Sequence, residues 1–282
     1  MKIFTHFNVD LDAVCSVWAA REFIPGARSA TVEFRPANWD GNGMSENDLA
    51  LDMEAGGYGM KGEKESDGTV HSCFASIVSQ YASPADQEAL ANLVRFVDAQ
   101  DSRGSAVKYL APEASREAQD ALAMTGLNAV VRALQATHPR NDAMVVERMS
   151  EILSGMLQAG RARHRAVAEV SEKAEIRPGG KVAIVTNARE FATNGVLFED
   201  HGVRVIVYVD GHNLGVIREG SETLRMDHPE IRAVVEATGE LSDWFAHPAG
   251  FLFCRGSRKA PAEDPSRVDP RSLAEVASRL LA

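Results

Sequence analysis

A histidine and two aspartates come directly after the first strand-like run of this chain, and they constrain its fold more than any other feature. Lys2 to Thr5 has the pattern of a short strand, and a helical pattern begins at Ala13. Between them, H-x-x-x-D-x-D places His6, Asp10 and Asp12 in a turn. At the carboxyl end of a strand in an open α/β sheet, side chains point into the crevice where ligands bind. The segment therefore predicts an α/β domain with a site at this edge of its sheet.

The chemistry of these three side chains suits a hard divalent cation. Two carboxylates one residue apart can reach two neighbouring cations, and the imidazole of His6 can complete the coordination of one. Oxygen ligands with a minority of imidazole favour Mn²⁺ or Mg²⁺ over structural Zn²⁺, which prefers Cys-rich sites. The alternative is that His6 caps the helix, while Asp10 and Asp12 occupy its first turn, where the helix dipole favours them.

The rest of the chain separates into three regions by pattern. In residues 1–140, short apolar runs alternate with helical stretches, which is typical of an α/β domain. In residues 141–178, apolar positions advance by three and four, which predicts a long connecting helix through Ile176 that stops at Arg177–Gly180. Residues 179–282 alternate strand patterns with two helical ones, which predicts a smaller α+β domain. We expect the sheet of the first domain to be mainly parallel.

Composition excludes several classes of protein. The 45% of hydrophobic residues can supply a core for 282 residues, and no apolar run reaches the length of a membrane span or a signal peptide. Three widely spaced cysteines suit reduced thiols, so we expect a cytoplasmic protein without a membrane partner. The formal charge of −10 argues against a footprint for duplex nucleic acid. It leaves a homodimer open. It also leaves an anionic substrate open, because bound cations can reverse the local field of an acidic site.

The first segment also resembles a known motif. The resemblance is to the first motif of the DHH phosphoesterase superfamily, which includes RecJ-like nucleases, oligonucleotide and cyclic-dinucleotide phosphodiesterases and family II inorganic pyrophosphatases. The residues that look especially like the pyrophosphatase version are His6, Asn8, Asp10, Asp12, Cys15 and Ser16. In that superfamily an Asp at a strand end, a DHH triplet and an Asp after a helix follow in order. The resemblance spans the first hundred residues.

Two single aspartates match the second and fourth motifs. Asp52 follows the strand-like run Asp48–Leu51, and the resemblance implies that it bridges two metal ions. Taken alone, it is a strand-end residue that begins a turn. Asp101 resembles the fourth motif, with Asp98 as the alternative. Two carboxylates near a helix C-terminus are unfavourable unless a cation compensates them.

The third motif is degenerate in this chain. Where the superfamily has Asp-His-His, the sequence reads Val70-His71-Ser72. If His71 matches the metal-binding histidine, Ser72 replaces a residue that touches the substrate. If it matches the second histidine, a metal ligand has been lost. A structural histidine is the plain alternative.

A short basic turn is the feature of interest in the C-terminal region. Ser257-Arg258-Lys259 resembles the start of the substrate-binding motif in the second domain of the pyrophosphatases. The Gly-Gly-Gly-His signature common in nuclease-type second domains does not occur in this sequence, and His247 with Gly250 resembles only a remnant of it. A solvated basic turn is the alternative. The resemblance implies that residues 179–282 form the substrate-binding second domain of the superfamily, called DHHA-like. Its expected substrate-binding residues are His247, Arg255, Gly256, Ser257, Arg258 and Lys259. The run Asp210–Asn213 has the residues of a hairpin turn between strands.

Together the motifs imply a two-metal hydrolysis with Mn²⁺ or Mg²⁺. The substrate would be pyrophosphate, another small phosphorylated compound or a short single-stranded oligonucleotide. The expected ligands are His6, Asp10 and Asp52 for one ion, and Asp12, Asp52, His71 and Asp101 for the other. The alternative is a non-catalytic module that binds a phospholigand or nucleotide in an eroded site. An ordinary dinucleotide-binding enzyme lacks support, because no G-x-G-x-x-G follows a strand.

Overall fold

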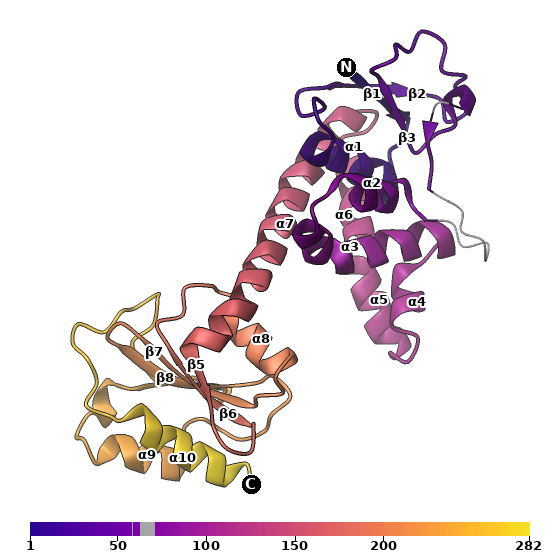
Figure 1. Ribbon diagram of the computed structural model, residues 1–282. Coiled ribbons are helices and arrows are strands. Elements are labelled where there is room, and N and C mark those ends of the chain that lie inside the picture. The colour runs from indigo at the N-terminus through magenta and orange to yellow at the C-terminus, as the bar shows by residue number, and fades with distance from the viewer. Residues whose placement is uncertain (58, 63–70) are drawn as a thin grey trace. The chain divides into compact units, whose positions relative to one another are not determined.

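The computed structural model describes residues 1–57, 59–62 and 71–282, and the chain forms two compact units, 1–161 and 162–282 (Figure 1). Their boundary falls within one helix, α7 (Asp142–Lys173), so the predicted connecting segment 141–178 contributes to both units. The prediction that this helix runs through Ile176 is wrong. Residues Ala174–Ile176 form strand β5, because they pair with a neighbouring strand and satisfy their backbone groups there. None of the described helices has the length and apolar character needed to cross a membrane.

The first unit is built on a four-stranded sheet in the order β2-β1-β3-β4, and every strand pair in it is parallel. This confirms the predicted α/β class with a parallel sheet. The strands are β1 (Lys2–His6), β2 (Thr31–Arg35), β3 (Leu49–Leu51) and β4 (Gly59–Met60). The helices are α1 (Leu11–Phe23), α2 (Cys73–Tyr81), α3 (Pro84–Arg103), α4 (Ala106–Leu110), α5 (Arg116–Thr125) and α6 (Leu127–Thr137), and η1 (Ala55–Gly57) is a short 3-10 turn.

Neighbouring side chains of β1 face opposite sides of this sheet, as the period of a strand requires. Ile3 packs into the large core formed with the helices, whereas Phe4 packs against Trp39 and Met44 of the long loop before β3. Residues 11–20 of α1 are buried without a break, so α1 is the central helix of the unit. A helix fixed on all sides holds the loop that precedes it in a defined position.

The N-terminal part of α7 completes the core of the first unit. Buried apolar residues at helical spacing, including Met149, Leu153 and Leu157, lie on one face of the helix. The indole Nε1 of Trp18 donates a hydrogen bond of 3.0 Å to the hydroxyl of Ser154 on the same helix. The packing of α7 therefore orients α1 as well as covering it.

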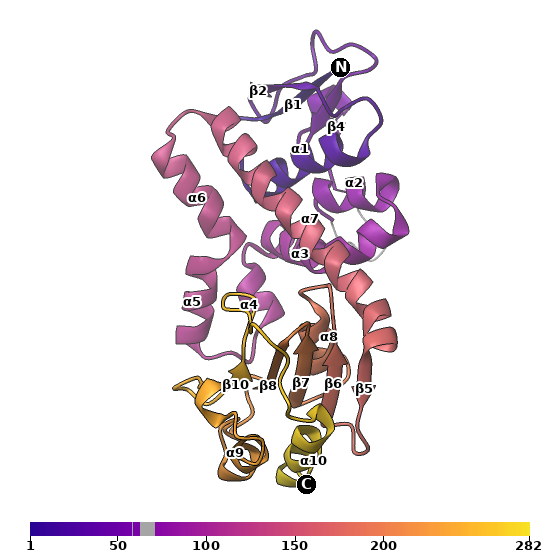
Figure 2. The ribbon, with the colours of Figure 1, turned by 90° about the vertical axis from the view of Figure 1, so that its left-hand side faces the viewer.

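The second unit contains a mixed six-stranded sheet in the order β5-β6-β7-β8-β10-β9, in which only β6 and β7 pair in parallel (Figure 2). The turn Asp210–Asn213 joins β7 to β8, and this confirms the predicted hairpin. Gly211 has φ +60°, a conformation that favours glycine.

The remaining strands are β6 (Val182–Thr186), β7 (Val205–Asp210), β8 (Asn213–Arg218), β9 (Phe245–Ala246) and β10 (Leu252–Arg255). The helices are α8 (Thr193–Glu199), α9 (Pro229–Glu236), α10 (Pro270–Leu280) and the 3-10 turn η2 (Leu241–Asp243).

Both faces of this second sheet are buried. Val182 and Ile184 of β6 point to the core shared with α9 and α10. Ala183 and Val185, which alternate with them, point to a separate core with α8 and the last turns of α7. A sheet covered on both faces explains why its strands are nearly continuous apolar runs.

The burial of α7 gives a direct stability prediction. Leu153 is 0% exposed and its neighbour Ile152 is 39% exposed on the same helix. We expect Leu153→Ala to lower the free energy of unfolding by about 2–5 kcal/mol, because it removes buried methyl groups and leaves a cavity. The matched Ile152→Ala should change it by less than about 0.5 kcal/mol. Urea unfolding followed by circular dichroism, with hydrogen exchange resolved by peptide, measures both effects; equal losses would contradict this role of α7.

Candidate metal centre

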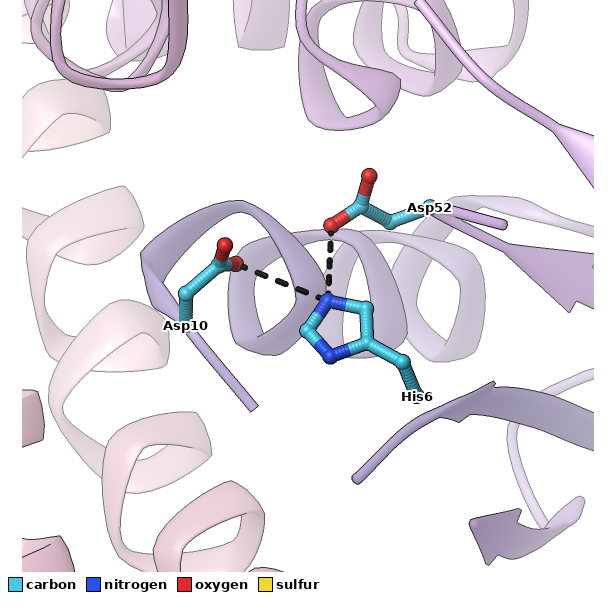
Figure 3. A group of neighbouring side chains, drawn as sticks. All are labelled: His6, Asp10 and Asp52. Carbon is cyan, nitrogen blue, oxygen red and sulfur yellow. Dashed lines mark hydrogen bonds and ion pairs between the residues drawn. The ribbon is translucent and has the colours of Figure 1, made fainter. Parts of the chain in front are cut away.

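Three of the predicted ligands lie together at one edge of the parallel sheet (Figure 3). His6 ends β1, Asp10 precedes α1, and Asp52 directly follows β3, which pairs with β1. The Nε2 atom of His6 lies 3.1 Å from Oδ2 of Asp52 and 3.9 Å from Oδ1 of Asp10. One ligand atom from each residue lies within 4.8 Å of the others. One imidazole nitrogen and two carboxylates at this spacing can coordinate one divalent cation.

The hydrogen bonds of His6 select which ring nitrogen faces the carboxylates. Nδ1 lies 2.9 Å from the carbonyl oxygen of Phe7 and donates to it, so Nε2 points toward Asp52. The hydrogen bond to Asp52 raises the pKa of His6 to about 9, against the effect of burial. This raised pKa favours a proton on Nε2 at neutral pH when no cation is bound. That proton occupies the place where a cation would bind.

The loop between β1 and α1 has a strained backbone that is fixed from outside. Asn8 has φ +53°, a left-handed conformation that is uncommon for residues other than glycine. Its N–H donates to Oδ2 of Asp142 at 3.1 Å, and the N–H of Val9 donates to Oδ1 of Asp142 at 3.3 Å. The side-chain amide of Gln135 donates to the carbonyl of Val9 at 2.8 Å. The first turns of α7 and the end of α6 thereby set the position of Asp10.

Asp10, and not His6, caps α1. Its Oδ1 accepts a 3.0 Å hydrogen bond from the N–H of Ala13. Asp52 is also in a left-handed conformation, with φ +56°, and its N–H donates to the carbonyl of Met60 at 2.8 Å. Strained residues of this kind persist where the surrounding structure requires them, and they cluster at functional sites.

Asp12 is buried and already has hydrogen-bond partners. Its two oxygens accept hydrogen bonds of 2.9 Å from the backbone N–H groups of Cys73 and Phe74, at the start of α2. Burial, and then the charge of Asp52, raise the pKa of Asp12 to about 8. Asp12 thus connects the first turn of α1 to the first turn of α2. It also places a titratable carboxyl group beside His6, Asp10 and Asp52.

Asp101 lies in the last turn of α3, where it lines a cavity of about 240 Å³ together with Asp10 and Asp12. Burial, and then the charges of Asp52 and Asp10, raise the pKa of Asp101 to about 6. Partial loss of water also raises the pKa of Asp10. Asn128 and Arg132 of α6 line the same cavity. Of the described residues lining it, Arg132 alone carries a positive charge.

His71 is hydrogen-bonded to an aspartate of α3. His71 Nδ1 donates to Oδ2 of Asp98 at 2.9 Å, while Oδ1 of Asp98 accepts from the N–H and hydroxyl of Ser72 at 2.8 and 2.6 Å. The Ser72 hydroxyl also caps α2 by accepting from Ala75. Thr69 and Val70, which complete the degenerate motif, lie outside the described residues. His71 is not among the three residues whose ligand atoms converge.

The predicted basic turn of the second unit is largely neutralised by local acids. Arg255 is 9% exposed, and its Nη2 donates to Oδ1 of Asp264 at 2.7 Å, while Nη1 donates to the carbonyl of the same residue. Arg258 lies 3.4 Å from Oδ2 of Asp210. Lys259 is exposed. Two of the three predicted phosphate-binding cations therefore already have carboxylate partners.

Two cavities lie beside this turn. Arg255, Gly256 and Ser257 line one of about 530 Å³, and Ser257 and Arg258 line another of about 320 Å³. Gly256 is required by the backbone, since it has φ +78° and a Cβ there would lie 2.2 Å from Oδ1 of Asn213. His247 lines neither cavity; its Nδ1 accepts from the N–H of Ala249 and its ring packs on Phe251.

Four residues near the cluster were not expected from the sequence. Asp142 and Gln135 hold the β1–α1 loop, and Asn128 and Arg132 line the cavity beside Asp10. The spacing of Asn128 and Arg132, four residues apart in a helical pattern, signals only a shared helix face. The sequence carries no signal that brings this face to the carboxylates.

No known protein-family model matches the chain. An alignment of 99 positions, which covers 30% of the chain, shows 31% identity to 1-deoxy-D-xylulose-5-phosphate synthase of Chlorobium phaeovibrioides. It covers only 16% of that enzyme. The fold and the cluster define an α/β protein with a carboxylate-rich candidate cation site at the edge of a parallel sheet.

Similar solved structures include RecJ from Thermus thermophilus in complex with Mg²⁺, with 12% identity and a TM-score of 0.32. The comparison covers 99% of this chain and 50% of RecJ, so the chain spans about half of that protein. The DHH domain of a member of the s1p family of ribosomal proteins has 13% identity over 99% of this chain and 86% of its own length, with a TM-score of 0.29. An uncharacterized protein from Helicobacter pylori has 11% identity over 99% and 98% of the two chains, with a TM-score of 0.24.

RecJ and the DHH domain are of the kind that the sequence motifs resemble. All three TM-scores lie below 0.5, so the likeness does not define a function for this chain. The geometry of the cluster is what supports one.

The proton on His6 predicts metal binding that strengthens with pH. Since the pKa of His6 is about 9 and a cation must displace its proton, the affinity for Mn²⁺ should rise by roughly tenfold for each pH unit between 6.5 and 8. Calorimetry in two buffers of different ionisation enthalpy should detect the release of about one proton or more for each ion bound. An affinity that stays constant with pH would contradict this arrangement of His6.

Asp12 should make the metal-free protein less stable as pH rises. Its folded pKa of about 8 lies above the ordinary value of 3.8, so its contribution to stability is complete below pH 4 and is lost as pH rises through 8. We expect the free energy of unfolding to fall by a few kcal/mol, on the order of one proton's linkage, between pH 5 and 8. Asp12→Asn should make this fall shallower in urea unfolding with a chelator present. An equally steep fall in the variant would assign the pH dependence to other groups.

Proposed function

We propose that this chain is a divalent-metal-dependent phosphohydrolase of the DHH type, acting by two-metal hydrolysis on a small phosphorylated compound, pyrophosphate or a short single-stranded oligonucleotide. The observation that carries the proposal is the convergence of His6, Asp10 and Asp52 within 4.8 Å at the end of neighbouring parallel strands. Asp12 and Asp101 add carboxyl groups around the same cavity. The donor set fits Mn²⁺ or Mg²⁺, because it is rich in oxygen and contains one imidazole.

Each candidate ligand would bind one or both of two ions. His6, Asp10 and Asp52 would hold the first ion, with the Phe7 carbonyl keeping Nε2 of His6 directed at it. Asp12, Asp101 and Asp52 would hold the second, with His71 as a further ligand by resemblance. When bound, the ions supply activation of a water molecule and neutralisation of charge on the phosphoryl group. The external hydrogen bonds to Asn8 and Val9 keep Asp10 in place while the site changes its charge.

One observation favours a second candidate function. Both oxygens of Asp12 are engaged at the start of α2, and His71 is paired with Asp98. A site that keeps those bonds retains three ligands for a single ion. It would bind a phosphorylated ligand without hydrolysing it. Metal analysis of the purified protein separates the candidates: two Mn²⁺ equivalents favour the enzyme, and one or none favours the binding module.

Loss of Asp52 gives the sharpest test of hydrolysis. Asp52→Asn keeps the shape of the side chain but removes the charge expected to bridge the ions. We expect Mn²⁺-dependent release of phosphate or nucleotide, over a panel of pyrophosphate, phosphate esters and short oligonucleotides, to fall by at least about 100-fold in kcat/KM.

The matched control is Asp120→Asn, which alters an exposed carboxylate of α5 that lines neither the 240 Å³ cavity nor the metal cluster. Its activity should equal that of the unaltered protein. Activity that survives Asp52→Asn would refute the assignment of this ligand, and a panel without any Mn²⁺-dependent product would refute the enzyme.

A further inference from the structure

A second cavity, of about 360 Å³, adjoins the one beside the carboxylates. Gln100, Asn128 and Arg132 line both cavities, so the two share a wall. The second cavity lies among helices α3 to α6 of the first unit. A ligand group held at the shared wall would therefore have space on both sides, with carboxylates on one side only.

The far side of the second cavity is apolar. Phe96, Val107, Ala123 and Met124 contribute to its lining, and Met124 is 78% exposed. Helix α5, which carries Ala123 and Met124, has no buried residue among its ten. A volume of about 360 Å³ bordered by an aromatic ring and a flexible thioether suits a compact organic group.

Arg132 is well placed to hold a phosphate between the two cavities. It is exposed, and it forms no ion pair with any residue in the described ranges. Asn128, one turn earlier on α6, presents an amide on the same face. Of the residues in the described ranges that line either cavity, only Arg132 is cationic. A guanidinium and an amide together provide donors for phosphate oxygens.

The position of Arg132 relative to the carboxylates is fixed by packing. Val131, next to it on α6, is 1% exposed in the core, and Leu134 packs against the same core. Gln135 of the same helix donates to Val9, one residue before Asp10. The helix that carries the cation is therefore hydrogen-bonded to the loop that carries a candidate ligand. This is the arrangement that positions a binding group precisely enough for a reacting phosphate.

We propose that the two cavities form one substrate site, in which Arg132 and Asn128 bind the phosphoryl group and the 360 Å³ cavity holds the organic part of a phosphate ester. The inference rests on the proposed function and selects its substrate class: organic phosphate esters with a compact apolar or aromatic group are preferred over inorganic pyrophosphate. Arg132 and Asn128 are substrate-binding residues of this site, and Ala123 and Met124 determine its specificity.

The test uses the full chain with Mn²⁺ and two phosphonates that cannot be hydrolysed. Phenylphosphonate should bind on the order of tenfold more tightly than methylphosphonate in calorimetry, because its ring enters the apolar cavity. Ala123→Trp should remove this preference by filling the cavity. The control, Ala121→Trp, alters an exposed residue of the same helix that lines neither cavity, and should preserve the preference.

Arg132→Ala should weaken both phosphonates by roughly 10- to 100-fold, since each loses a charge-assisted hydrogen bond, and Arg132→Lys should restore part of the loss. The control, Arg148→Ala, removes an exposed arginine of α7 paired with Glu151 and should leave both affinities unchanged. Circular dichroism verifies that each variant is folded.

Hydrolysis of 4-nitrophenyl phosphate and of pyrophosphate separates the two proposals. Phenylphosphonate binding with the expected preference but without hydrolysis of either compound overturns the proposed function and supports the site. Hydrolysis without any phenyl preference, or with a preference that Ala123→Trp leaves intact, overturns the inference and keeps the function. The absence of binding of either phosphonate overturns the inference as well.

Discussion

Mutual repulsion among the carboxylates around one pocket is the constraint on which the first unit depends. Asp10, Asp12 and Asp101 line a single cavity, and Asp52 lies close enough to raise the pKa of each of them. The fold offsets this repulsion in several ways. Asp12 accepts two N–H groups at the positive end of α2, Asp10 caps α1, and a protonated His6 lies between Asp10 and Asp52. The remaining unfavourable charge would favour a divalent cation at this site, because binding would replace protons and repulsion with coordination.

The hydrogen bonds that each candidate ligand already makes determine how freely its oxygen or nitrogen atoms could bind a cation. His6, Asp10 and Asp52 come from strand ends and a helix cap, and their ligand atoms converge. Asp12 must share its oxygens with α2, so a second ion would compete with backbone N–H groups for the same lone pairs. A carboxylate oxygen has more than one lone pair, and it can accept an N–H and coordinate a cation together. The first ion should therefore bind in a preformed site, and the second should bind where hydrogen bonds have to adjust.

Much of this could be predicted from the sequence, because local patterns determined it. The strand at Lys2, the parallel sheet and the hairpin at Asp210–Asn213 follow from periodicity and turn chemistry. The first helix was also predicted, but it begins at Leu11, so that Asp12 lies in its first turn and not in the preceding loop. The roles of Asp142 and Gln135 could not be predicted, since they contact the β1–α1 loop from more than 120 residues away. The end of α7 was misplaced for a similar reason: Ala174–Ile176 continue a helical apolar pattern, yet pairing with β6 determines their structure. His71 was predicted to bind a metal ion; its Nδ1 is hydrogen-bonded to the carboxylate of Asp98, three residues before Asp101, and its role as a ligand stays a prediction.

Ion pairs with nearby carboxylates also determine which arginine side chains are available to bind a phosphate. The sequence pointed to Arg255 and Arg258, because clustered cations beside a glycine suit phosphate oxygens. In the second unit Arg255 is buried and bonded twice to Asp264, so a phosphate would have to displace that residue or compete with it. Displacing a carboxylate that is already paired with a buried arginine costs more than binding to a cation that has no such partner. Arg132 is exposed and lines the cavity of the carboxylate cluster, and within the described part of the chain it has no acidic partner. A short basic motif thus overstates the binding capacity of the second unit, whereas a single arginine on a helix face, without any motif, has both the location and the available charge that a phosphoryl group requires.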